Sequence, residues 1–300
     1  MKPTNFSRII ATSLITLFYF HSSMAQRVVR VTEPNAVNPA EVSVAINPKN
    51  PDNVLGASLQ IGSSTGPRAG SYTYTSIDGG KTWKSVPTPN VENLVQGDDI
   101  VVFSHDGTAY HAHLSFTGIR VARPTRADNA ISVNTSRDGG LTWTDGVPTV
   151  RHINSVTPFE DKPGMVVDNA PGSRNKGNLY VAWTRFDVYG SRNPEHKSQI
   201  YFSRSTDGGK SFSMPIRISD TGGDCVDSDN TVEGAVPAVG PNGEVYVVWA
   251  GPLGLVFDKS IDGGLTFGQD KKIADFPGGW DFDVEGISRA NGMPVTGVDL

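Results

Sequence analysis

Cysteine is almost absent from this sequence, which limits how the chain can be cross-linked. Cys225 is the only cysteine among 300 residues, so no disulfide can form within one chain. A lone thiol could act as a nucleophile, but no histidine lies near Cys225 in the sequence to activate it. We therefore interpret Cys225 as a loop thiol without a catalytic role.

Charged residues and helical patterns are also scarce. Only 19% of the residues are charged, the formal net charge is −5, and no run of lysine or arginine occurs. These features argue against nucleic acid or anionic lipid as a partner. No segment keeps a 3.6-residue apolar period over ten residues. With 33 glycines and 20 prolines, the composition indicates a turn-rich, all-β protein.

The N-terminus has the features of a signal peptide. Lys2 and Arg8 precede the apolar run IIATSLITLFYF at 9–20, and small residues follow up to Ala25. The run is short for a bilayer span, and no later stretch is long and apolar enough to form one. We expect residues 1–25 to be removed on export, leaving a secreted, periplasmic or cell-surface chain of residues 26–300.

One eight-residue motif occurs four times in the remaining chain. SIDGGKTW (76–83), SRDGGLTW (136–143), STDGGKSF (205–212) and SIDGGLTF (260–267) place aspartates 60, 69 and 55 residues apart. Three short strand-like segments precede each motif, so each unit reads as four strands joined by tight turns. Such four-stranded units in series are typical of a β-propeller, whereas a two-sheet sandwich would not need the same turn in every repeat.

The motif itself is explained by folding. Its paired glycines accept the positive φ of a tight turn, and its aspartate can accept backbone N–H hydrogen bonds. The final Trp or Phe can pack against the sheet. We therefore assign a structural rather than catalytic role to its four aspartates, which are Asp78, Asp138, Asp207 and Asp262.

The four copies of S-x-D-G-G-x-[TS]-[WF] resemble the Asp-box, or bacterial neuraminidase repeat, of sialidase-like β-propellers. The resemblance implies six or seven blades when complete. About four and a half are expected here, because residues 283–300 read as the start of a fifth, and we expect the natural protein to be longer. The [FY]-R-I-P arginine motif of sialidases has no counterpart in EVSVAINP at 41–48. The chain thus resembles an exported bacterial branch that lacks this motif.

The loops that lead into the innermost strands are repeatedly acidic, and a propeller gathers such loops on one face. We predict that Asp98, Asp161 and Glu233 are catalytic carboxylates there. Asp281, Asp283 and Glu285 alternate along one segment and could bind calcium through oxygen ligands, although no cofactor is required. Cationic and aromatic side chains complete the predicted site, with Arg120, Arg185 and Trp280 as substrate-binding candidates.

Two functions remain open from the sequence. The first is an exported, exo-sialidase-like glycoside hydrolase that acts on the carbohydrate of a glycan or glycoprotein through the acidic face. The second is a non-catalytic propeller that binds a glycan or protein on the same face. The sequence predicts neither the substrate nor the oligomeric state.

Overall fold

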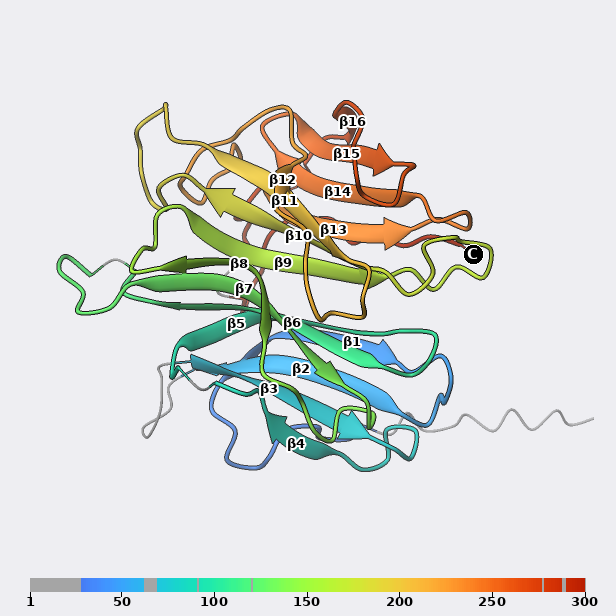
Figure 1. Cartoon of the computed structure of the whole chain (residues 1–300). Coiled ribbons are helices and arrows are strands. Elements are labelled where there is room, and N and C mark those ends of the chain that lie inside the picture. The colour runs from blue at the N-terminus through green and yellow to red at the C-terminus, as the bar shows by residue number, and fades with distance from the viewer. Residues whose placement is uncertain are drawn as a thin grey trace, which may run out of the picture.

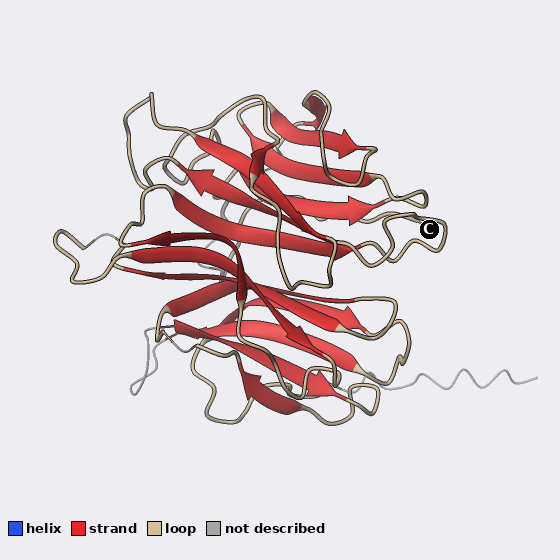
Figure 2. Cartoon of the chain, viewed as in Figure 1, coloured by secondary structure: helices blue, strands red, loops and turns tan. Residues whose placement is uncertain are grey.

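The computed structural model describes residues 28–61, 69–90, 92–119, 121–276, 278–287 and 290–299. The predicted signal peptide at 1–25 lies outside these ranges. The described chain contains sixteen strands and no helix. Figure 2 shows the strands in red. It accordingly has no helix that could span a membrane.

The strands form four antiparallel sheets of four strands each, and the strands of each sheet are consecutive in the sequence. We call these sheets blades 1 to 4. Blade 1 holds β1 (Pro39–Ile46), β2 (Val54–Ile61), β3 (Ala69–Ser76) and β4 (Lys84–Pro87). Blade 2 holds β5 (Val95–Phe103), β6 (Ala109–Thr117), β7 (Asp128–Ser136) and β8 (Val147–Ile153). Blade 3 holds β9 (Phe159–Val167), β10 (Leu179–Phe186), β11 (Ser198–Ser205) and β12 (Ile216–Arg217). Blade 4 holds β13 (Glu233–Val239), β14 (Val245–Gly251), β15 (Gly254–Ser260) and β16 (Lys271–Ala274).

Successive blades pack side by side through their first strands (Figure 1). Contacts run from β1 to β5, from β5 to β9 and from β9 to β13, so these four strands line one inner edge. The four-stranded blades and all-β class predicted from the repeats are thereby confirmed.

The hydrophobic core lies between the blades. Trp183 of blade 3 belongs to one hydrophobic cluster with Tyr110 and Ile131 of blade 2, and Trp249 of blade 4 belongs to another with Tyr180 and Phe202 of blade 3. Trp183 and Trp249 are almost completely buried. Because burial of one large apolar side chain contributes on the order of 2 kcal/mol, these interfaces couple each blade to the next.

The repeated motif forms the turn between the third and fourth strand of every blade. In blade 1, Asp78 Oδ1 accepts hydrogen bonds from the Lys81 and Thr82 amides at 3.0 and 2.9 Å. Thr82 Oγ1 donates to Asp78 Oδ2 at 2.6 Å, and Ser76 Oγ donates to Asp78 Oδ1 at 2.8 Å. These donors hold the pKa of Asp78 well below its usual range. The side chain is thus occupied by the turn.

The predicted start of a fifth blade does not form a strand. Within 283–287 and 290–299 the structure contains only an isolated bridge between Val284 and Ile287. An innermost strand needs a second strand to complete its hydrogen-bond ladder, and the described chain offers none at this position. The described propeller therefore consists of four blades, about half a blade fewer than we predicted.

Candidate active site

Every innermost strand is interrupted by a β-bulge at the same position. The pairing register shifts between Ala40 and Ser43 in β1, between Gly97 and Ile100 in β5, beside Asp161 in β9, and between Glu233 and Val236 in β13. A bulge bends the strand and redirects its side chains, and bulges are enriched near active sites. The four blades thus turn the same segment out of the sheet.

The residue in each bulge has a left-handed backbone. The φ angles are 55° at Glu41, 54° at Asp98, 48° at Lys162 and 74° at Gly234. Only blade 4 uses glycine, the residue that adopts this conformation without steric cost. A non-glycine residue there costs roughly 1–2 kcal/mol. Three charged residues held in this conformation indicate that the side chains are needed where the bulge places them.

The bulges surround a cavity of about 150 Å³. Its lining residues are Glu41, Asp98, Asp161, Lys162, Tyr189, Asp227, Glu233, Trp280 and Asn291. The structure therefore brings together all three predicted catalytic carboxylates and the predicted aromatic residue Trp280. They come from different blades and meet because the bulges lie at equivalent heights. We call this space the central cavity.

The carboxylates in the central cavity perturb one another. Removal from bulk water, followed by the nearby charges of Asp98 and Glu233, raises the pKa of Asp161 well above its usual value. The same two effects, enclosure and the charge of Asp98, raise the pKa of Glu41 to about 7. The Asp98 amide donates to Glu41 Oε2 at 3.2 Å, so the bulges of blades 1 and 2 are directly joined.

Lys162 supplies the positive charge among these groups. Its Nζ lies 4.0 Å from Asp98 Oδ1, and its backbone amide donates to Asp161 Oδ1 at 3.1 Å. Enclosure alone would lower the pKa of Lys162, but the surrounding carboxylates, Asp98 first, outweigh it and raise that pKa. The arrangement can hold a neutral carboxyl group beside ionised ones, which is the requirement for a general acid and a charged partner in one site.

Arg185, a predicted substrate-binding residue, is instead engaged in a buried ion pair. Its Nε and Nη2 each lie 2.7 Å from Oε1 of Glu160, and its guanidinium stacks 3.8 Å above the Tyr201 ring. Glu160, which is fully buried, also contacts His152 Nε2 at 2.7 Å and accepts a hydrogen bond from Trp183 Nε1 at 2.5 Å. Arg185 does not line the central cavity. The other predicted arginine, Arg120, lies outside the described residues.

The predicted calcium ligands do not form a cluster. Asp281, Asp283 and Glu285 are all exposed, and in the described ranges no three histidine, cysteine, aspartate or glutamate side chains are placed to share a metal ion. The segment is not extended, so the alternation on which we based the prediction does not bring the three side chains to one face. Calcium binding stays a prediction from sequence.

Glu41 and Lys162 are cavity residues that the sequence pattern only weakly indicates. Glu41 lies just before the apolar core of the first innermost strand, and when the four innermost strands are aligned by their bulges it matches Asp98, Lys162 and Gly234. The signal in the sequence that supports this alignment is a charged residue or a glycine just before the apolar core of each innermost strand. Tyr189 and Asp227 reach the cavity from loops, and Tyr189 Oη lies 3.4 Å from Asp227 Oδ1.

Comparison with solved structures places this fold among sialidase-like β-propellers. A leech intramolecular trans-sialidase superposes with a TM-score of 0.54 at 12% identity, covering 83% of this chain and 54% of the other. A Hadza microbial sialidase gives 0.53 at 15% identity, covering 76% and 45%. A Penicillium chrysogenum α-L-arabinanase gives 0.50 at 15% identity, covering 77% and 64%. The chain thus spans about half the length of these two sialidases. No family model and no curated protein matches the sequence.

Proposed function

We propose that the protein is a glycan-acting propeller that hydrolyses glycosidic bonds in the central cavity. The observation that carries this proposal is the convergence of Asp98, Asp161 and Glu233, from three blades, beside the buried indole of Trp280. Paired carboxylates in unlike protonation states are the usual machinery of glycoside hydrolysis, and an indole offers a stacking surface for a sugar ring. The sialidase and arabinanase likenesses, which concern the fold, are consistent with it.

Asp161 is the general acid in this proposal. Removal from bulk water, and then the negative charges of Asp98 and Glu233, raise the pKa of Asp161 well above its usual value, which favours the protonated form that a general acid needs. The proton passes to the glycosidic oxygen as the bond to the anomeric carbon breaks. Glu233, which is only 5% exposed, then stabilises the developing positive charge on the sugar or activates the attacking water. Lys162, whose Nζ lies 4.0 Å from Asp98 Oδ1, supplies a positive charge beside Asp98.

The charge of the central cavity favours a neutral sugar over an anionic one. Five carboxyl groups line it against one cation, Lys162, and no arginine is among its described lining residues. Even with Asp161 and Glu41 protonated, three carboxylates would face one lysine. The carboxylate of a sialic acid would be repelled there, since no bidentate guanidinium is available among these lining residues to hold it. The first innermost strand, which lacks the arginine motif of sialidases, supports the same preference.

Export through residues 1–25 is part of the proposal. A glycan-acting protein outside the cytoplasm meets polysaccharides and glycoproteins directly, which fits the signal-like N-terminus. Detection of mature protein beginning near Gln26 in a secreted or periplasmic fraction would support this part, and intact Met1 protein in the cytoplasm alone would contradict it.

A non-catalytic binding propeller is the second candidate, and the size of the central cavity favours it. About 150 Å³ is less than the roughly 300–1,000 Å³ of typical ligand pockets, so only part of one sugar could enter. In that case the cavity carboxylates would hold the bulges, and a glycan or glycoprotein would bind across their rim without bond cleavage.

Hydrolysis of a fluorogenic glycoside panel by the full chain decides between the two candidates. We expect turnover of a neutral glycoside, little turnover of a sialoside, and loss of about 100-fold or more in Asp161→Asn and Glu233→Gln. Glu195→Gln, an exposed carboxylate outside the cavity, is the matched control and should keep full activity. Turnover that survives both cavity substitutions would overturn the catalytic assignment. Glycan-array binding without turnover would establish the second candidate.

A further inference from the structure

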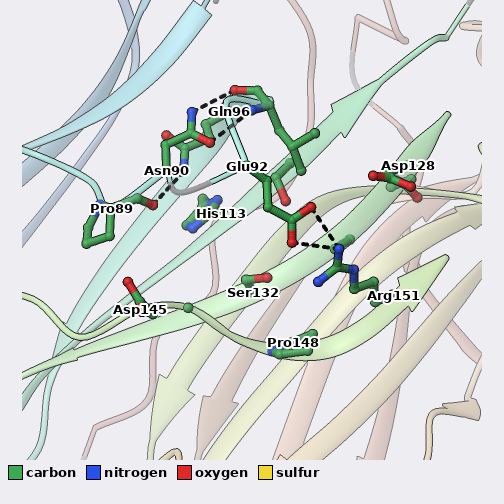
Figure 3. A pocket seen from close by; sticks show the side chains of 15 residues that line it. Pro89, Asn90, Glu92, Gln96, His113, Asp128, Ser132, Asp145, Pro148 and Arg151 are labelled. Atoms are coloured by element: carbon green, nitrogen blue, oxygen red, sulfur yellow. Dashed lines mark hydrogen bonds and ion pairs between the residues drawn. The ribbon is translucent and has the colours of Figure 1, made fainter. Parts of the chain in front are cut away.

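A second cavity lies away from the proposed active site, on the sheet face of blade 2. It has a volume of about 250 Å³. Its floor comes from β5, β6 and β7, and part of its wall comes from Pro89, Asn90, Glu92 and Leu94, which lie between blades 1 and 2 in the sequence (Figure 3). None of its lining residues lines the central cavity. We call it the interblade pocket.

The pocket exists because blade 2 carries small side chains where blade 3 carries large ones. Counted from the bulge and along the pairing register, Ser115 of β6 is equivalent to Arg185 of β10, and Ser132 of β7 is equivalent to Tyr201 of β11. In blade 3, Arg185 and Tyr201 stack on each other and fill this face. In blade 2, two serines leave the same space open.

A third exchange changes the floor of the pocket. His113 on the second strand of blade 2 is equivalent to Trp183 in blade 3 and Trp249 in blade 4. The equivalence follows from the strand pairing, in which His113 lies opposite Ser132, Trp183 opposite Tyr201, and Trp249 opposite Val256. Burial, followed by the charge of nearby His111, lowers the pKa of His113 to about 4, so its imidazole is neutral at ordinary pH. At His113 the floor is therefore polar but uncharged.

Three buried polar groups face the pocket with hydrogen-bonding capacity that the protein does not use. Ser115 and Ser132 are 6% and 9% exposed, and in the described structure their hydroxyls make no hydrogen bond to another residue. Gln96, 3% exposed, donates through Nε2 to the Pro89 carbonyl at 3.2 Å, and its Oε1 accepts none from the described residues. These three oxygen atoms are open to the pocket rather than sealed in the core, so a ligand in the pocket can form hydrogen bonds with them in place of water.

The rim of the pocket is already ordered. Arg151 Nη2 lies 2.6 Å from Glu92 Oε1 (Figure 3). Arg126 pairs with both Glu92 and Asp128. Asn90 fixes the wall, because its side chain accepts from the Leu94 amide at 2.9 Å and donates to the Leu94 carbonyl at 2.7 Å. Two arginines balance two of the rim carboxylates, so the pocket does not strongly favour a charged ligand. A preformed pocket loses little entropy when a ligand binds.

We propose that the interblade pocket is a carbohydrate-binding site for one neutral sugar residue, held by Gln96, Ser115 and Ser132. A sugar presents several hydroxyl groups that both donate and accept, which matches two serine hydroxyls and one amide oxygen. Its C–H groups would contact the apolar side chains that line the pocket, which are Pro89, Leu94, Ala130 and Pro148. The site is independent of hydrolysis in the central cavity and would hold a glycan at blade 2.

Ligand-observed NMR with neutral monosaccharides, run on the full chain, tests the proposal. The probes are galactose, glucose, mannose, arabinose and N-acetylglucosamine, with glucuronate and glucosamine as charged counterparts. We expect at least one neutral sugar to bind in the millimolar range and to be displaced by no charged counterpart. Replacing both hydroxyls in Ser115→Ala/Ser132→Ala should weaken this binding about tenfold, the loss that corresponds to one or two hydrogen bonds.

Two further variants make the result specific to this pocket. Ser132→Tyr places the blade 3 residue in the space and should abolish binding, and its melting temperature will show whether the fold is kept. Asp161→Asn alters the central cavity and should leave this binding unchanged. Absence of binding by every neutral sugar at tens of millimolar, or binding that survives Ser115→Ala/Ser132→Ala and is lost in Asp161→Asn, would overturn the proposal.

Discussion

Glu160 and Arg185 form a buried ion pair in blade 3, with Oε1 of the carboxylate 2.7 Å from both Nε and Nη2 of the guanidinium. Trp183 and His152 use the remaining capacity of the carboxylate. This pair occupies the face that is hollow in blade 2. The same four-stranded frame therefore gives a solid, charge-paired face in one blade and a ligand-sized pocket in its neighbour.

Breaking this pair should destabilise the protein strongly. Glu160→Gln would leave the Arg185 guanidinium, whose side chain is only 17% exposed, without its counter-charge. Loss of one partner of a buried pair typically costs about 3–5 kcal/mol of unfolding free energy, which urea denaturation will measure. Glu92→Gln is the matched control, since it removes an exposed carboxylate that also pairs with arginines and should cost less than about 1 kcal/mol. Equal losses in the two variants would contradict a structural role for the buried pair.

The second glycine of the repeated turn fixes how closely blades can approach. In blade 2, a Cβ on Gly140 would lie 2.2 Å from Leu55 Cδ1 of blade 1, and φ at Gly140 is +92°. We expect Gly140→Ala to lower the unfolding free energy by more than the roughly 1 kcal/mol that left-handed alanine costs alone, because fully buried Leu55 has little room to move. Thermal unfolding followed by circular dichroism will measure the difference.

Gly190→Ala separates the two contributions. Gly190 also has a positive φ, +80°, but a Cβ added there would meet no described atom within 4 Å. It should therefore show only the conformational cost. If Gly140→Ala were no more destabilising than Gly190→Ala, the contact with Leu55 would not limit blade packing.

The turns were predictable from sequence because their chemistry is local. Ser76, Asp78 and Thr82 satisfy one another within a single turn, so the residues that make the geometry are adjacent in the chain. The order of the four strands in each blade was predictable from the same repeats. The gathering of Asp98, Asp161 and Glu233 was also predictable, because each precedes the core of an innermost strand and the propeller superimposes those positions.

The remaining site features depend on non-local geometry. Arg185 looked like a substrate ligand because its partner Glu160 lies 25 residues away and is paired only through the ladder between β9 and β10. The bulges that rotate Glu41 and Lys162 into the central cavity reflect register shifts, which no periodicity in the sequence reveals. The interblade pocket depends on comparing side-chain volumes across blades once the register is known.

Acid should weaken the repeated turns in a defined window. Hydrogen bonds from the Ser211 and Ser205 hydroxyls and the following amides outweigh burial and lower the pKa of Asp207 to about 2. A carboxyl group with a depressed folded-state pKa stabilises the fold above its unfolded pKa, near 4, and loses that contribution as pH falls toward 2. Asp207→Asn should therefore flatten the pH dependence of unfolding free energy between about pH 4 and 2. An unchanged slope would show that Asp207 is not held by the turn in solution.

The raised pKa of Glu41 predicts the opposite pH dependence of the unfolding free energy, at higher pH. Its folded-state pKa of about 7 exceeds the ordinary glutamate value of 4.5, so between these values the folded protein holds a proton that the unfolded chain releases. Unfolding free energy should then fall as pH rises from about 5 to 7 and level off above it. Glu41→Gln removes the titrating group while keeping its size and should remove this slope, as measured by urea denaturation at a series of pH values. Glu195→Gln, with an exposed carboxylate, should retain the wild-type slope. If Glu41→Gln lost as much stability as the wild type between about pH 5 and 7, Glu41 would not be the group that causes the slope. The central cavity would then be more exposed to water than the geometry indicates.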